Sequence, residues 1–101
     1  MRALVRDYGR VHSACILAKL ITADSESLFT SGEDRILKQF SVKEQKLTKN
    51  YGVAHRYPVC AMEATSDNEW LFTCDNYGYI KQWDIKNLQK CWRKLGKIIY
   101  G

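Results

Sequence analysis

The side chains best suited to chemistry in this 101-residue chain are two histidines, four cysteines and eleven carboxylates. A histidine beside a carboxylate can act as a general acid or base, and cysteines spaced with histidines can hold zinc. The cysteines stand at positions 15, 60, 74 and 91, without a C-x-x-C pair or a zinc-type cysteine–histidine spacing. We therefore expect small, buried, reduced thiols on strands. A disulfide framework would need a secretory context, and no secretion signal is visible.

The two histidines are related by an internal repeat. Residues 8–43 align with residues 51–86 without a gap and are identical at 13 of the 36 positions. Ordinary composition would give about two identities. The matched pairs include Tyr8/Tyr51, Gly9/Gly52, His12/His55, Thr22/Thr65, Asp24/Asp67, the two "LFT" segments and Lys38-Gln39/Lys81-Gln82. Catalytic groups normally occur once, whereas structural groups recur with the period, so His12 and His55 are predicted to be structural.

Known catalytic motifs are missing from the sequence. It has no G-x-S-x-G elbow, no G-x-x-x-x-G-K-[ST] loop and no H-E-x-x-H helix, and its glycines are too scattered to cradle a phosphate. We expect no enzyme activity, no catalytic residue, no metal site and no cofactor.

Each repeat is predicted to consist of short strands separated by turns. The first strands are expected at 15–21 and 59–65, and the second at 27–31 and 70–74, which are rich in Phe, Thr and Trp. The third, at 36–42 and 79–85, alternate apolar and polar residues as half-buried strands do. Weaker fourth strands are expected at 46–52 and 88–96. The turns between them carry Asp, Ser, Asn and Gly.

A period near 43 with four strands is that of a propeller blade. With "SGEDRILKQF" and "GYIKQWDI" as strand–turn–strand segments, the chain resembles the WD40-repeat family over residues 8 to 90. The resemblance implies an all-β fold of four-stranded antiparallel blades. Two blades make an incomplete propeller, since propellers close with about 4–8. We expect residues 1–101 to be a WD40 repeat region, with repeats at 8–50 and 51–93 and a third beginning at 94–101.

The resemblance also implies a hydrogen-bonded chain in each blade, made of a histidine, a turn aspartate, a strand hydroxyl and a third-strand tryptophan. In the first repeat His12, Asp34 and a hydroxyl from Thr30 or Ser31 match, but Phe40 replaces the tryptophan. The second repeat supplies His55, Thr73 and Trp83, but Tyr77 replaces the aspartate, and Asp75 could substitute from a shifted turn. Each network is thus expected to lack one member.

What remains for function is the surface. In a propeller, the turns before the first strand and those between the second and third strands lie on one face. Here they contain Arg10, Arg35, Arg56, Tyr57, Tyr77 and Tyr79. Arginine and tyrosine are enriched at interface hot spots, so these residues are candidates for binding a protein or peptide partner. The alternative is that they cap the blade or pack on neighbours.

The leading hypothesis is therefore a non-catalytic scaffold that mediates protein–protein interaction and complex assembly. The alternative is a nucleic-acid or ribonucleoprotein-binding module, because the chain has a formal net charge of +5 and no acidic residue after Asp84. The basic segment comprises Lys86, Lys90, Arg93, Lys94 and Lys97. No apolar run is long enough to span a bilayer. We expect an intracellular protein with no membrane partner, cytoplasmic rather than nuclear.

The ends of the chain bear on assembly. "MRALVRDYG" is expected to be the last strand of a preceding blade or a broken end, and "GKIIYG" the start of a further unit. An unclosed blade pair predicts a fragment, a truncated product, or a chain that closes by assembling with copies of itself or with additional blades.

Overall fold

The computed structural model describes residues 3–86 and 93–97, and its strands form two antiparallel sheets of four strands each. The first sheet contains β1 (Ile16–Ile21), β2 (Ser27–Gly32), β3 (Ile36–Ser41) and β4 (Lys46–Val53). The second contains β5 (Val59–Ala64), β6 (Trp70–Asp75), β7 (Tyr79–Asp84) and β8 (Arg93–Lys97). Within each sheet every strand pairs with the next one along the chain. The predicted all-β class of four-stranded antiparallel blades is confirmed.

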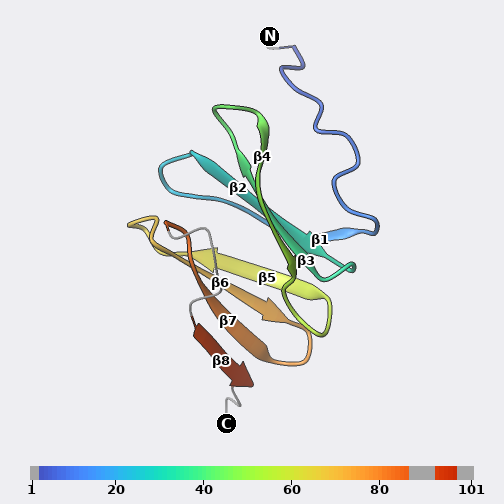
Figure 1. The fold of residues 1–101 in the computed structure, drawn as a ribbon, viewed down its shortest axis with the longest axis vertical. Coiled ribbons are helices and arrows are strands. Elements are labelled where there is room, and N and C mark those ends of the chain that lie inside the picture. Colours follow the sequence, from blue (N-terminus) through green and yellow to red (C-terminus); the bar gives the residue numbers. More distant parts are fainter. Residues whose placement is uncertain (1–2, 87–92, 98–101) are drawn as a thin grey trace.

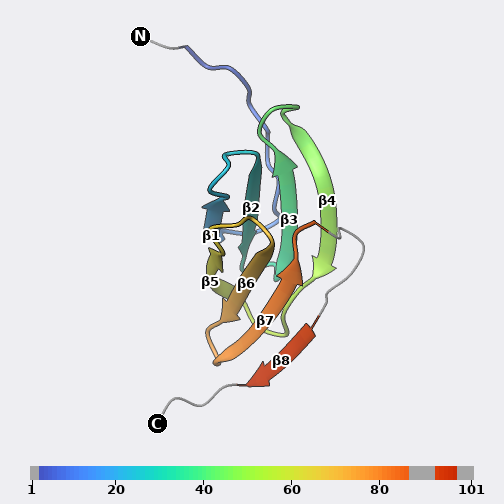
Figure 2. The ribbon, with the colours of Figure 1, turned by 90° about the vertical axis from the view of Figure 1, so that its left-hand side faces the viewer.

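The two sheets lie side by side as neighbouring layers, with β1 next to β5 (Figure 1). Turned by 90°, the strands of each sheet run in sequence order from β1 and β5 on one side to β4 and β8 on the other (Figure 2). The core lies between the layers. Phe29 of β2, Leu37 of β3 and Leu71 of β6 are fully buried, and Trp83 of β7 joins the same cluster. Burying such a side chain stabilises the fold by about 1.5–3 kcal/mol, so stacking of the sheets is the main source of stability.

The turns after β1 and β5 are built alike in the two sheets. The Thr22 hydroxyl donates to Asp24 at 2.6 Å, and the Asp24 carboxylate accepts the Glu26 amide at 3.0 Å. The equivalent bonds join Thr65 to Asp67 at 2.6 Å and Asp67 to the amide of Glu69 at 3.0 Å. The left-handed residue in each turn also corresponds, with φ of 62° at Ser25 and 63° at Asn68. The sequence repeat is therefore also a repeat of local geometry.

The N-terminal segment copies contacts made by β4, although residues 3–9 form no strand. Tyr8 lies edge-on to Phe40 with ring centroids 5.5 Å apart, as Tyr51 lies edge-on to Trp83 at 5.3 Å. Gly9 and Gly52 have φ of 72° and 76°. Lys38 donates to the carbonyl of Val11, and Lys81 donates to that of Ala54. Tyr8 and Val11 thus contact the first sheet in the same way as Tyr51 and Ala54 contact the second.

The sheets and the sequence repeats have different limits. β4 continues through Val53, so Tyr51, Gly52 and Val53 complete the first sheet although they begin the second repeat. The expected boundary between residues 93 and 94 likewise falls inside β8. The first seven strands begin and end within one residue of their predicted limits. The expected fourth strand at 88–96 is described only from Arg93 onward, and residues 88–92 lie outside the described part of the chain.

The prediction of buried thiols is wrong for Cys15 and Cys60, which are exposed. Cys15 precedes β1, and Cys60 lies in β5, the first strand of its sheet. In the described sheets β1 and β5 are edge strands, so Cys60 lies in an edge strand and Cys15 directly before one. Cys74, in β6, is half-buried, and burial raises the pKa of its thiol. Cys91 lies outside the described residues.

Candidate functional site

A buried histidine ties the first sheet to its own turn. Nδ1 of His12 lies 2.7 Å from the Asp34 carboxylate, and Nε2 lies 2.7 Å from the hydroxyl of Thr30. Because a carboxylate only accepts, Nδ1 carries a proton and donates it. The other carboxylate oxygen of Asp34 accepts the amide of Ile36 at 3.1 Å. One aspartate therefore holds the histidine ring and the start of β3 together.

Thr30, and not Ser31, supplies the hydroxyl in this network. The Ser31 hydroxyl donates instead to the carbonyl of Ile36 at 2.6 Å. Phe40 occupies the third-strand position and is buried, but it has no polar hydrogen to donate. The network of the first sheet therefore ends at Thr30.

The network of the second sheet is complete, and the expectation that it would lack its carboxylate is wrong. Nδ1 of His55 lies 3.2 Å from the carboxylate of Asp75, and Nε2 lies 2.7 Å from the hydroxyl of Thr73. The indole N–H of Trp83 donates to the same hydroxyl at 2.9 Å. Asp75 also accepts the amides of Tyr77 and Tyr79 at 2.9 and 3.1 Å. A connected buried chain of this kind rigidifies a small sheet.

The two carboxylates come from positions that do not correspond in the repeat. Asp75 aligns with Gly32, and Asp34 aligns with Tyr77. At Gly32 a β-carbon would lie 2.0 Å from the carbonyl oxygen of Cys15, so the first sheet cannot carry an aspartate there. The first sheet therefore takes its carboxylate from position 34. In the second sheet Asp75 accepts the hydrogen bond from the histidine, so position 77 does not need a carboxylate and carries a tyrosine.

The electrostatics agree with these assignments. Partial burial alone would raise the pKa of Asp34, but hydrogen bonds from His12 and the amide of Ile36 hold it below its usual value. Burial lowers the pKa of His55, with Asp75 opposing this shift. His55 is thus held as a neutral ring that donates through Nδ1 and accepts from Thr73 through Nε2.

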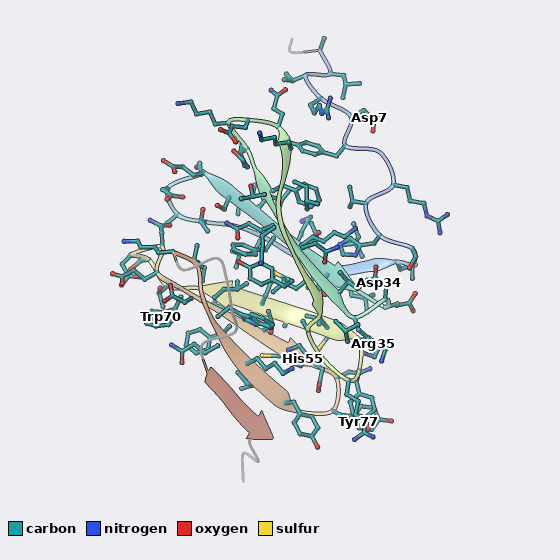
Figure 3. All side chains as sticks on the ribbon, in the orientation of Figure 1. Asp7, Asp34, Arg35, His55, Trp70 and Tyr77 are labelled. Atoms are coloured by element: carbon teal, nitrogen blue, oxygen red, sulfur yellow. The ribbon has the colours of Figure 1, made fainter. Side chains whose placement is uncertain are left out.

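The candidate binding residues gather where the loops of the two sheets meet. The rings of Tyr57 and Tyr77 stack with centroids 4.1 Å apart and planes 12° apart, and Tyr79 is near-parallel to Tyr57 at 6.4 Å. Arg35 of the first sheet donates to the carbonyl of Arg56 at 3.4 Å. Figure 3 shows Asp34, Arg35 and Tyr77 at one end of the strands and Trp70 at the other. We call Arg35, Arg56, Tyr57, Tyr77 and Tyr79 the Arg/Tyr patch.

Arg10 makes local hydrogen bonds, and within the described residues it makes none to this patch. Its guanidinium donates to the carbonyls of His12 and Ser13 at 3.2 and 2.7 Å. It therefore closes the turn that leads into β1, which is the capping role left open by the sequence. The stacking of Tyr57 on Tyr77 was not predicted from the sequence, although both residues were placed in turns on the same face of the propeller.

The basic segment lies partly outside the described residues. Lys86 is exposed and follows β7, whereas Lys90 lies outside the described residues. Backbone pairing places Arg93 opposite Gln82 and Lys94 opposite Lys81 in the second sheet. Within residues 3–86 no group of three His, Cys, Asp or Glu side chains could hold a metal ion. The described residues also contain no helix long and apolar enough to cross a membrane.

Solved structures with this arrangement are WD40 propellers. The chain matches "Structure of U3-55K" and "Crystal structure of RRP9 WD40 repeats", each with a TM-score of 0.74, 24% identity and 79% of this chain covered. It also matches the β-propeller domain of Cps50 (Swd1) from Myceliophteria thermophila, with a TM-score of 0.73, 10% identity and 85% of this chain covered. The fold is that of WD40 propeller blades.

The match concerns part of a propeller. The chain spans 26% of the length of each of these three solved chains. No protein-family model and no curated protein sequence matches it. At this level of identity the likeness establishes the fold.

Proposed function

We propose that the chain is a non-catalytic WD40 scaffold that mediates protein–protein interaction and complex assembly through the Arg/Tyr patch. WD40 propellers are typically scaffolds without catalytic activity, which supports the proposal at the level of the fold. The observation that carries it is the exposure of the patch. Tyr77 is 57% exposed and Tyr79 is 37% exposed, although both are large aromatic residues.

The patch is also where the two repeats differ most. His12, Thr30 and Lys38 have identical partners in the second repeat, and all of these residues make matching structural contacts. The residues of the patch have no such counterparts. Arg35 aligns with Gly78, and Arg56, Tyr57, Tyr77 and Tyr79 align with Ser13, Ala14, Asp34 and Ile36. Most residues that hold the blades together recur, with Asp34 and Asp75 as exceptions. Exposed side chains that are found once and lie outside the networks are therefore the ones free to bind a partner.

Nucleic-acid binding remains the second candidate, because Lys86, Lys90, Arg93, Lys94 and Lys97 form a stretch without acidic residues. Exposed Lys86 supports it. This segment runs from Lys86, at the far end of β7, back to Lys97, whose backbone pairs with that of Tyr79. The scaffold is favoured because Tyr57 and Tyr77 stack on each other, which leaves fewer free ring faces for bases. We also propose an intracellular, cytoplasmic location, and repeats at 8–50 and 51–93 followed by a further one from 94.

A photo-cross-linking experiment tests this function. Benzoylphenylalanine replaces Tyr77 in the chain expressed in cells, and covalent adducts are identified by mass spectrometry after irradiation. The matched control carries the same amino acid at exposed Ser66, which lies in the turn at the opposite end of β6. We expect discrete protein adducts from position 77 alone. Adducts equal at both positions, or nucleic acid as the only adduct at 77, would refute the proposal.

A further inference from the structure

We infer that the Arg/Tyr patch recognises a linear peptide segment that combines carboxylates with aromatic or other apolar side chains. This inference rests on the proposed function and specifies the chemistry of the partner. It depends on three features of the patch: unpaired positive charge, an arginine in an unfavourable backbone conformation, and tyrosine rings that stack on one another.

The positive charge of the patch has no carboxylate partner in the described chain. Within residues 3–86 the ion pairs are His12–Asp34, His55–Asp75 and Lys46–Glu44, and none includes an arginine. Two carboxylates beside the patch, Asp34 and Asp75, are engaged by histidines and backbone amides, and the exposed Glu33 of the turn between β2 and β3 takes part in none of these ion pairs. Two exposed guanidiniums in adjacent loops therefore favour a ligand that carries carboxylates, which arginine binds through paired hydrogen bonds.

Arg35 occupies a backbone conformation that suits glycine better. Its φ is 68°, in the left-handed region, and its counterpart in the second repeat is Gly78 with φ of 91°. A non-glycine residue there is strained, and such strain is concentrated at functional positions. An arginine at this position thus costs stability that glycine would not, and what the arginine adds is a guanidinium directed at the loop of the neighbouring sheet.

The tyrosines favour a peptide over single-stranded nucleic acid. Platforms for single strands offer free aromatic faces to successive bases and a basic groove for the backbone. Here Tyr57 and Tyr77 cover each other at a centroid distance of 4.1 Å, which removes one face of each ring. The exposed ring of Tyr77 still offers an apolar surface with a phenol hydroxyl at its edge. Such a surface suits one anchoring side chain of a peptide.

Fluorescence anisotropy with defined probes tests the inference on the whole chain. The probes are a short labelled peptide that alternates Glu with Phe, its counterpart with Gln in place of Glu, and single-stranded oligouridine of equal length. We expect the Glu peptide to bind at least about tenfold more tightly than the Gln peptide, since charge-assisted hydrogen bonds are lost in the latter. Equal binding of the two peptides, or tighter binding of oligouridine, would overturn the inference.

Two variants separate recognition from folding. Arg35→Gly removes the charge and relieves the left-handed strain, so we expect unchanged or higher thermal stability with at least about tenfold weaker binding of the Glu peptide. Arg35→Gly combined with Arg56→Ala should abolish the binding. The charge-matched control, Lys43→Ala with Lys46→Ala, changes exposed residues at the opposite end of β3 and should leave binding within about twofold. A similar loss in this control would refute the patch as the site.

The outcomes also distinguish this inference from the proposed function. If protein adducts form at position 77 but the Gln peptide binds as well as the Glu peptide, the scaffold stands and the acidic specificity is wrong. If no protein adduct forms at position 77, the proposed function itself is wrong.

Discussion

The carboxylate of Asp75 lies 3.2 Å from Nδ1 of His55, although Asp75 stands two residues before the position that the repeat assigns to this role. The second blade thus keeps the contact between its histidine and a carboxylate, but an aspartate at a different position in the repeat supplies the carboxylate. The shift makes position 77 available for Tyr77, whose ring stacks on Tyr57. A structural network and an exposed patch are in this way linked through one turn.

The two aspartates should be of similar importance for stability. Asp34→Ala and Asp75→Ala each leave a buried histidine and turn amides without an acceptor, so we expect each to lower the free energy of unfolding by roughly 1–3 kcal/mol. Tyr77→Phe removes only an exposed hydroxyl and should change it by less than about 0.5 kcal/mol. Urea unfolding of the three variants, carried like the variants below in a chain extended by further blades, checks this. Asp75→Ala behaving like Tyr77→Phe would show that Asp75 is not in the network.

The indole of Trp83 predicts an asymmetry between the blades. Trp83→Phe leaves the Thr73 hydroxyl without its donor and also removes buried volume, so we expect it to cost more than Phe40→Leu, which loses volume alone. Thr73→Val should cost more than Thr30→Val, because the former breaks two side-chain hydrogen bonds and the latter one. Thermal midpoints of the four variants provide the test. Equal losses from Thr73→Val and Thr30→Val would argue against an engaged indole.

Stability should decline on mild acidification because of His55. Burial lowers its folded pKa, so the unfolded chain binds the proton more readily. The stabilisation is complete above the unfolded pKa of about 6.5 and is lost as the pH falls from there toward the folded pKa. The lowered pKa of Asp34 places its own loss at lower pH, below about 4. Thermal midpoints between about pH 7.5 and pH 5 should therefore fall in the wild type and change less in His55→Asn. Identical slopes in both proteins would exclude His55 as the cause.

The isolated chain should not behave as a compact, stable monomer. Among the described residues, the edge strands of the two sheets pair on one side only, and Ile21 and Val53 are 60% and 59% exposed. Two blades also fall short of the three or more repeats that stable arrays usually need. Size-exclusion chromatography with light scattering should show self-association or a broad distribution, and urea unfolding should be poorly cooperative. A monodisperse monomer with one sharp transition would contradict this expectation.

The basic segment should give only weak, non-specific affinity for polyanions. Lys86, Lys90, Arg93, Lys94 and Lys97 are spread along about one strand, with Trp92 as their sole interleaved aromatic residue. Binding of single-stranded RNA should fall steeply between low and moderate salt. Fluorescence anisotropy at two salt concentrations measures this. Tight binding that persists at high salt would favour the nucleic-acid module over the scaffold.

The sequence was sufficient to predict the blades because their signals are local and occur twice. "ILKQFS" and "YIKQWD" alternate in polarity, and the turns at Asp24 and Asp67 carry the same hydrogen-bonding side chains. The role of Asp75 could be raised only as an alternative. Its role is shown by the 3.2 Å contact of its carboxylate with His55, which no spacing in the sequence reveals. The approach of the Cys15 carbonyl to Gly32 explains only why the first sheet does not use the equivalent position. The exposure of Cys15 and Cys60 was missed for a related reason, since alternation does not show which edge of a sheet is left uncovered.

The central claim is that the buried hydrogen-bond networks hold the blades together, whereas the exposed side chain of Tyr77 binds the partner. Its most direct test compares Tyr77→Ala with Thr73→Val in two measurements: the thermal midpoint, and pull-down of the protein that photo-cross-linking at position 77 identifies. We predict that Tyr77→Ala abolishes capture while lowering the midpoint much less than Thr73→Val does. Undiminished capture by Tyr77→Ala, or a midpoint as low as that of Thr73→Val, would contradict the claim.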